Sequence, residues 1–74
     1  MSLSEIKPGQ KGKVHSIQGN KALMKRLFAL GCTPGTEVKV VKMAPLGDPM
    51  IINFRGFNLA IRKNDAKNIL LKEV

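Results

Sequence analysis

The chain has 74 residues, of which 43% are hydrophobic, so it can form one domain over residues 1–74 with a small core. That size leaves little room for an enzyme with a deep pocket, and no apolar stretch approaches the ~20 residues of a membrane helix. Thirteen Lys and Arg residues against five Asp and Glu give a net charge of +8, which favours polyanionic partners such as RNA, DNA, anionic lipid or an acidic protein face.

The first part of the chain is predicted to form an extended lead-in, a strand and a helix. Ile6–Gln10 contains a Pro-Gly turn dipeptide. Lys13–Ile17 reads as a strand, and its imperfect alternation indicates a bulge. Asn20 is a favourable N-cap, and the helical period runs over Lys21–Leu30.

The predicted helix carries an apolar stripe on one face. Leu23, Leu27 and Leu30 are spaced at i, i+4 and i+7 and are expected in the core. Met24 and Phe28 broaden the stripe. A helix this short cannot bury all five on a small barrel, so these two residues are either core or a partner-binding surface.

A glycine stop and a turn separate this helix from the second strand. Gly31 is placed to adopt a positive φ just after the helix, and Pro34-Gly35 forms a turn. Thr36–Met43 is the predicted strand, with a phase slip in its apolar pattern. Ala44–Pro49, with two prolines and a glycine, is predicted to be a loop.

The last third contains three more short strands. Met50–Phe54 and Phe57–Arg62 flank Arg55-Gly56, which fits a two-residue hairpin turn. Lys63–Ala66 is predicted to be one helical or 3₁₀ turn, and Ile69–Lys72 a final strand. The expected fold is therefore mainly β, a small SH3-like barrel of about five strands with one short α-helix between the first two strands.

Two segments together resemble the ferrous iron transport protein A family, FeoA. Arg26–Thr36 contains Leu-Gly followed by Pro-Gly-Thr, and Ala44–Pro49 has the sequence Ala-Pro-Leu-Gly-Asp-Pro. Shorter matches lie at Lys7–Gln10, Arg55-Gly56 and Leu59–Arg62, so that the resemblance covers Leu3 to Val74. It implies a cytoplasmic, non-enzymatic SH3-like domain that assists FeoB, the membrane protein that imports Fe(II) and carries a cytoplasmic G-protein domain.

The expected partner-binding residues come from the helix and from the Ala44–Pro49 loop, taken as the two walls of a groove. They are Met24, Phe28, Leu46, Asp48 and Ile51. Ile51 stands where alternation and the family pattern both favour a polar outward residue, so it is expected to add to an exposed apolar patch.

Metal-ligating residues are few and badly spaced. His15, Cys32 and Asp48 match no metal motif, so neither a metal site nor a cofactor is predicted from them. His15 is expected to be exposed and Cys32 to be a small core residue, although a larger aliphatic residue is typical of the family at that position. The fold class also occurs in iron-dependent repressors, so the resemblance leaves transition metal ion binding open.

A small nucleic-acid-binding barrel is the alternative function. The glycine-rich Gly9–Val14 segment and the charge of +8 favour it, whereas three Phe without Trp or Tyr offer poor stacking surfaces. No acid–base pair or nucleophile constellation supports an enzyme. Met1–Glu5 lacks the features of a signal peptide, so a cytoplasmic location is expected. The oligomeric state and the sign of any effect on iron uptake stay open.

Overall fold

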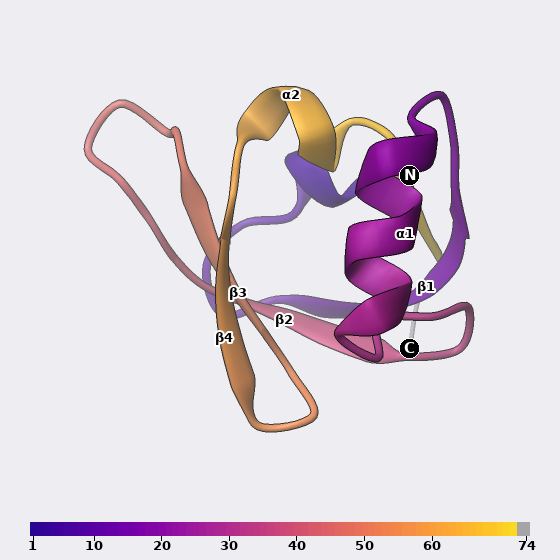
Figure 1. The fold of residues 1–74 in the computed structure, drawn as a ribbon. Coiled ribbons are helices and arrows are strands. Elements are labelled where there is room, and N and C mark those ends of the chain that lie inside the picture. The colour runs from indigo at the N-terminus through magenta and orange to yellow at the C-terminus, as the bar shows by residue number, and fades with distance from the viewer. Residues whose placement is uncertain (73–74) are drawn as a thin grey trace.

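Five antiparallel strands curl into one sheet in the computed structural model, which describes residues 1–72 (Figure 1). The strand order is β4-β3-β2-β1-β5. The elements in chain order are the 3₁₀ helix η1 (Leu3–Glu5), β1 (Lys11–Ile17), α1 (Lys21–Ala29), β2 (Glu37–Met43), β3 (Met50–Phe54), β4 (Phe57–Ile61), α2 (Lys63–Ala66) and β5 (Ile69–Lys72). The predicted strands, the helix between the first two strands and the short turn before the last strand are confirmed.

The helix α1 begins where its sequence predicts. The Asn20 side-chain oxygen accepts a hydrogen bond from the Leu23 N–H at 3.0 Å, which satisfies one of the free donors of the first turn. Leu23 and Leu27 are buried against the sheet. Gly31 has a φ of 90° and lets the chain turn sharply after the helix.

The expectation that Leu30 belongs to the core is wrong. The helix ends at Ala29, and Leu30 is the C-cap residue, with 38% of its side chain exposed. Leu30 keeps a helical backbone, but the chain turns away at Gly31 directly after it, so the i+7 position lies beyond the surface that Leu23 and Leu27 cover. The helix therefore fully buries only two of its residues, Leu23 and Leu27.

The strand β3 buries every second residue on the inner face of the sheet. Met50, Ile52 and Phe54 of β3 are all fully buried. The predicted irregularities in the first two strands are confirmed. The β1–β5 register shifts between Val14 and Ser16, and the β2–β3 register shifts between Val40 and Lys42. These shifts bend a short sheet enough to enclose a core.

The β3–β4 hairpin has the predicted two-residue turn. Arg55 and Gly56 have φ values of 55° and 77°, which match the twist of the flanking strands, and Phe54 pairs with Phe57 across the turn. The Arg55 side chain lies over the end of α1, within about 3.5 Å of where a side chain at Gly31 would begin. This contact connects the hairpin to the helix stop.

A short 3₁₀ helix that the sequence analysis did not predict precedes the lead-in of Ile6–Gln10. Leu3–Glu5 forms η1, and Leu3 is completely buried. The Ser2 N–H donates to the Glu5 carboxylate at 3.1 Å, which is half of a capping box. A single turn is too short to show a helical period, but the Ser-x-x-Glu spacing was a usable signal.

Candidate partner-binding surface

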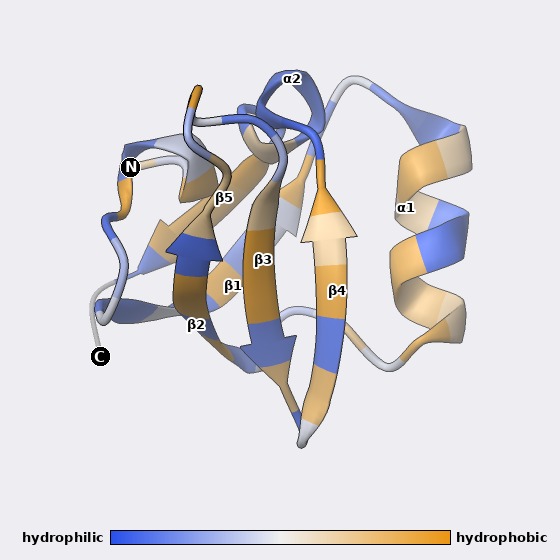
Figure 2. Ribbon diagram, turned by 90° about the vertical axis from the view of Figure 1, so that its left-hand side faces the viewer, coloured by the Kyte–Doolittle hydropathy of each residue, from blue (hydrophilic) through white to orange (hydrophobic). Residues whose placement is uncertain are grey.

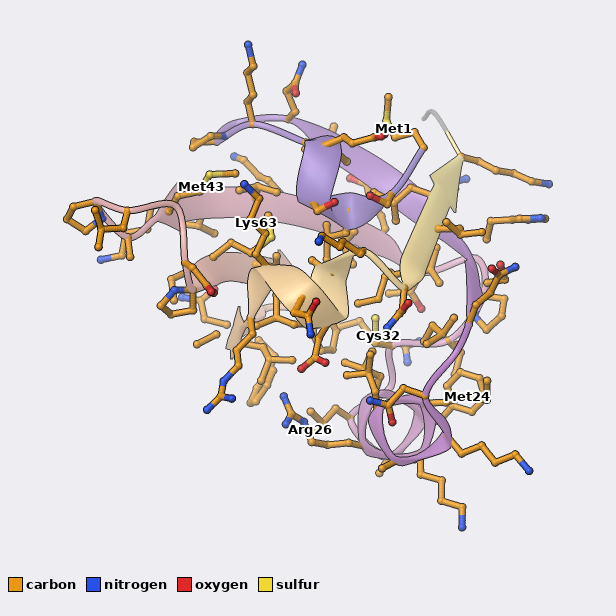
Figure 3. The ribbon with its side chains drawn as sticks, turned by 90° about the horizontal axis from the view of Figure 1, so that it is seen from above. Met1, Met24, Arg26, Cys32, Met43 and Lys63 are labelled. Carbon is orange, nitrogen blue, oxygen red and sulfur yellow. The ribbon has the colours of Figure 1, made fainter. Side chains whose placement is uncertain are left out.

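The helix candidates lie together on one face of α1. Phe28 is 41% exposed, whereas Met24 is half-buried and packs against the edge of the core. They are four residues apart, so they are neighbours on the helix surface. Figure 3 shows Met24 on the side of α1 opposite to Arg26. Phe28 is thus an accessible aromatic side chain, with Met24 as its partly buried support.

The loop candidates have different structural roles. Leu46 is 96% exposed and makes no contribution to the core. Asp48 accepts a hydrogen bond from the Lys63 N–H at 3.0 Å, which fixes the loop to the first turn of α2. Ile51 is half-buried and pairs with Ala60 on β4. Asp48 is therefore a structural residue as well as a candidate contact.

The structure does not bring the helix and the Ala44–Pro49 loop together as walls of one groove. The loop projects from the β2–β3 hairpin on one side of the molecule, and α1 lies on the other (Figures 1 and 2). The candidates thus fall into two sets. We call Met24 and Phe28 the helix set, and Leu46, Asp48 and Ile51 the loop set.

Two open hollows lie on the surface, and the second of them includes Asp48 of the loop set. One, of about 430 Å³, is lined by Thr33, Pro34, Gly35, Thr36, Glu37 and Arg55. The other, of about 530 Å³, is lined by Asp48, Pro49, Ala60 and Arg62. Neither Arg55 nor Arg62 was among the partner-binding residues predicted from the sequence. Arg55 stands at a hairpin position that normally favours Asn, Asp or Gly, and it also lies in one of the short matches to the FeoA family.

The three potential metal ligands do not converge. His15 is exposed on β1, and Cys32 is fully buried in the interior (Figure 3). Across residues 1–72, no group of three or more His, Cys, Asp or Glu side chains is placed to hold a metal ion. Burial raises the pKa of the Cys32 thiol to about 11, so the thiol stays protonated near neutral pH.

Basic side chains gather on the outer face of the sheet. Lys11 lies opposite Lys39, and Lys13 lies opposite Lys72, in the cross-strand register. Like charges in such positions repel each other. Lys11 also pairs with Glu37 at 3.4 Å, but both side chains are about half exposed, so the pair is weak. This face therefore carries a net positive charge.

Comparison with known proteins gives one consistent family. A family model described as "FeoA domain" matches residues 1–73. The chain is 32% identical, over 69 residues, to an Fe(2+) transport protein A/Fe(2+) transporter FeoB fusion protein of Porphyromonas gingivalis. The match covers 93% of this chain and 8% of that protein, so the chain spans a small part of this relative.

Solved structures agree with the family match. The FeoA protein from Chlorobium tepidum superimposes with a TM-score of 0.95 at 39% identity, over 100% of this chain and 70% of that one. Stenotrophomonas maltophilia FeoA, described as a procaryotic SH3 domain protein complexed with zinc, gives a TM-score of 0.85 at 32% identity, over 97% and 89%. The predicted SH3-like barrel is therefore confirmed.

More distant structures share the fold alone. A manganese-dependent transcriptional repressor matches with a TM-score of 0.88 at 12% identity, over 100% of this chain and 41% of that one. None of the helices described within residues 1–72 is long and apolar enough to cross a membrane.

Proposed function

This chain belongs to the FeoA family, and we propose that it assists Fe(II) uptake by binding the cytoplasmic part of the FeoB transporter. FeoA is a non-enzymatic accessory domain, so a binding role fits its class. The fusion protein of Porphyromonas gingivalis is the observation that carries the proposal. Its FeoA-type segment matches 93% of this chain and is covalently joined to FeoB.

Covalent fusion indicates that the two parts work side by side. A tether holds two modules at an effective concentration that reaches millimolar for a short flexible linker. A separate chain must replace that tether with a binding surface of its own. The proposal therefore requires a specific contact between this chain and FeoB, with residues 1–74 acting as one domain in the cytoplasm.

We assign that contact to the helix set. Interfaces derive most of their affinity from a few apolar or aromatic anchors, and Phe28 is an accessible aromatic side chain on a regular element. Met24 adds an adaptable side chain beside it. The loop set is the competing surface, because Leu46 is the most exposed large apolar side chain among residues 1–72. The two sets lie on different sides, so substitutions can separate them.

The test is calorimetric titration of the purified cytoplasmic part of FeoB from the same genome with this protein. Phe28→Asp is expected to weaken binding about ten-fold or more, since it removes an apolar anchor. Ala29→Asp is the matched control, because it adds the same charge at the neighbouring exposed helix position. Thermal melts check that the variants remain folded.

Leu46→Asp decides between the two surfaces. A large loss of affinity in Leu46→Asp, with none in Phe28→Asp, would move the docking site to the loop set. Absence of binding by the unmodified protein, in the presence or absence of guanine nucleotide, would contradict the FeoB proposal itself.

A further inference from the structure

The sheet has two edges, and within residues 1–72 the chain pairs with only one of them. At the β5 edge, the Leu71 N–H donates to the Met1 carbonyl at 2.8 Å, and Ser2 forms a bridge with Leu70. At the other edge, β4 pairs with β3 alone. Figure 2 shows β4 as the outermost strand of the sheet. An open edge is a template for another strand, and natural proteins usually cover it.

The register identifies which backbone groups of β4 point outward. In a two-residue hairpin the closing pair is hydrogen-bonded, and bonded pairs then alternate along the strands. Phe57, Leu59 and Ile61 therefore bond to β3. The N–H and C=O groups of Asn58 and Ala60 face away from the sheet, both residues are exposed, and no backbone group among residues 1–72 bonds to them.

The inner face of the same strand is not fully closed. Ile61 is buried, Leu59 is half-buried, and Phe57 is 45% exposed although its ring lies 5.7 Å from that of Phe54. The barrel thus opens progressively toward the hairpin. An added strand would place every second side chain on this face, where apolar residues would cover Phe57 and Leu59.

One arginine lies at each end of the open edge of β4. Arg55 stands at the hairpin end of β4 and lines one of the two hollows. Arg62 stands at the other end and lines the second hollow, with Ala60 at its wall. Asp48, the acidic residue in that second hollow, already accepts the Lys63 N–H. At about 3.3 Å per residue, the five residues of β4 span roughly 16 Å between the two arginines.

We propose that the open edge of β4 binds an extended acidic segment of a partner protein as an additional strand. The segment has apolar or β-branched residues in its centre and carboxylates near both ends, which pair with Arg55 and Arg62. The main-chain bonds to Asn58 and Ala60 supply affinity, and the end charges supply specificity. This proposal does not rest on the docking of FeoB at α1.

A second copy of the chain fits this edge poorly. Antiparallel pairing of two β4 strands would bring Arg55 of one copy beside Arg62 of the other, at both ends. Each copy also carries a net charge of +8. Like charges brought together in an interface repel each other, so self-pairing is disfavoured.

The probe is a capped nine-residue peptide with alternating Val and Thr in the centre and two Glu at each end. A peptide with Lys in place of Glu is its matched control. Binding is followed by amide chemical shifts and hydrogen exchange of the labelled protein. The Glu peptide is expected to shift and protect the Asn58 and Ala60 amides, and the Lys peptide is expected not to bind.

Two kinds of variant test the two parts of the proposal. Ala60→Pro removes an outward donor while leaving the β3–β4 bonds in place, and is expected to weaken peptide binding about ten-fold. Arg55→Gln and Arg62→Gln leave the backbone unchanged, and each is expected to weaken peptide binding about five-fold. Lys21→Gln on α1 is the control and is expected to leave peptide binding unchanged. If Ala60→Pro does not fold, the arginine variants and the amide pattern still decide.

Other outcomes would overturn the proposal. Shifts confined to α1 or to the lysine face of β1 and β2 would place the peptide elsewhere. Equal binding of the Glu and Lys peptides would remove the role of the arginines. Protection of the Asn58 and Ala60 amides that rises with protein concentration, without peptide, would show that the edge pairs with a second copy.

Discussion

Two glycines near the end of α1 share one backbone geometry but not one environment. Gly31 and Gly35 have φ values of 90° and 92°. A Cβ at Gly31 would lie 3.2 Å from the Arg55 guanidinium nitrogen Nη1, whereas nothing lies within 4 Å of one at Gly35. Gly35→Val is expected to lower the free energy of unfolding by ~1–3 kcal/mol through strain, and Gly31→Val by more. Urea melts of both variants measure the difference, and an equal loss would show that the Arg55 contact adds nothing.

Cys32 makes stability depend on pH in the alkaline range. Burial raises its pKa in the folded protein from 9.0 to about 11, so the unfolded chain loses this proton first as pH rises. Its contribution is complete below pH 9 and is lost between pH 9 and about 11. The stability difference between the unmodified protein and Cys32→Ala should therefore be constant up to pH 9 and shrink above it. Effects of pH that the two proteins share cancel in this difference, so a constant difference to pH 11 would contradict the shift.

Metal binding provides a second test at the scale of residues. His15 is exposed, Cys32 is buried and protonated, and Asp48 is held by the Lys63 N–H. Tight zinc sites in proteins usually need about four converging ligands. Anaerobic calorimetry is therefore expected to show no Fe(II) or Zn(II) bound with micromolar affinity. One equivalent bound tightly, and lost in His15→Ala, would identify a ligand and overturn this expectation.

At the scale of elements, α1 depends on its cap because it buries little. It fully buries only Leu23 and Leu27, and its Asn20 cap satisfies the Leu23 N–H. Asn20→Ala is expected to lower the free energy of unfolding by ~1 kcal/mol, whereas Asn20→Asp keeps the acceptor and should cost little. Hydrogen exchange should show faster opening of the α1 amides in Asn20→Ala. Unchanged exchange would show that tertiary packing alone holds the helix.

Local chemistry explains why most elements were predictable. The Asn20 cap, the Gly31 stop and the Arg55-Gly56 turn each act within a few residues, and all three are confirmed. The alternation of apolar residues in β3 is also a local pattern, and it correctly predicted that Met50, Ile52 and Phe54 share one buried face. The prediction for Leu30 failed because a helical period assigns a residue to a face of the helix but does not show how far along the helix the core extends. η1 was missed because one turn shows no period.

At the scale of the whole molecule, the arrangement of surfaces could not be predicted. The groove between α1 and the Ala44–Pro49 loop was wrong because the distance between elements depends on the path of the entire sheet (Figure 1). The open β4 edge likewise follows from the strand order, which no local pattern encodes. Sequence supplied exposed candidates such as Phe28 and Leu46, and only the fold separates them into sets. The FeoB partner came from resemblance, since no residue pattern in the chain specifies it.

The distribution of charge over the molecule separates protein docking from polyanion binding. Three lysines lie close together on the outer face of β1 and β2. Lys11 lies opposite Lys39, and Lys13 lies opposite Glu37. A single-stranded RNA that neutralises three lysines should show a log–log salt slope of about −2, so affinity should fall roughly twenty-fold from 50 to 200 mM salt. Fluorescence anisotropy at these two salt concentrations measures this. Replacing Lys11, Lys13 and Lys39 together by Gln should abolish the RNA signal.

The affinity for FeoB should depend much less on salt than the affinity for RNA. Apolar anchors such as Phe28 are insensitive to screening, and rim charges act mainly on the rate of association, so affinity for FeoB should change only a few-fold over the same range. The triple lysine variant should retain it. RNA binding that stays micromolar at 200 mM salt, together with no FeoB association, would replace the transport proposal with the nucleic-acid-binding one. If RNA binding is lost at high salt while FeoB binding persists, the protein is a docking domain. Its net charge of +8 is then a property of its solvated surface and does not mark a nucleic-acid site.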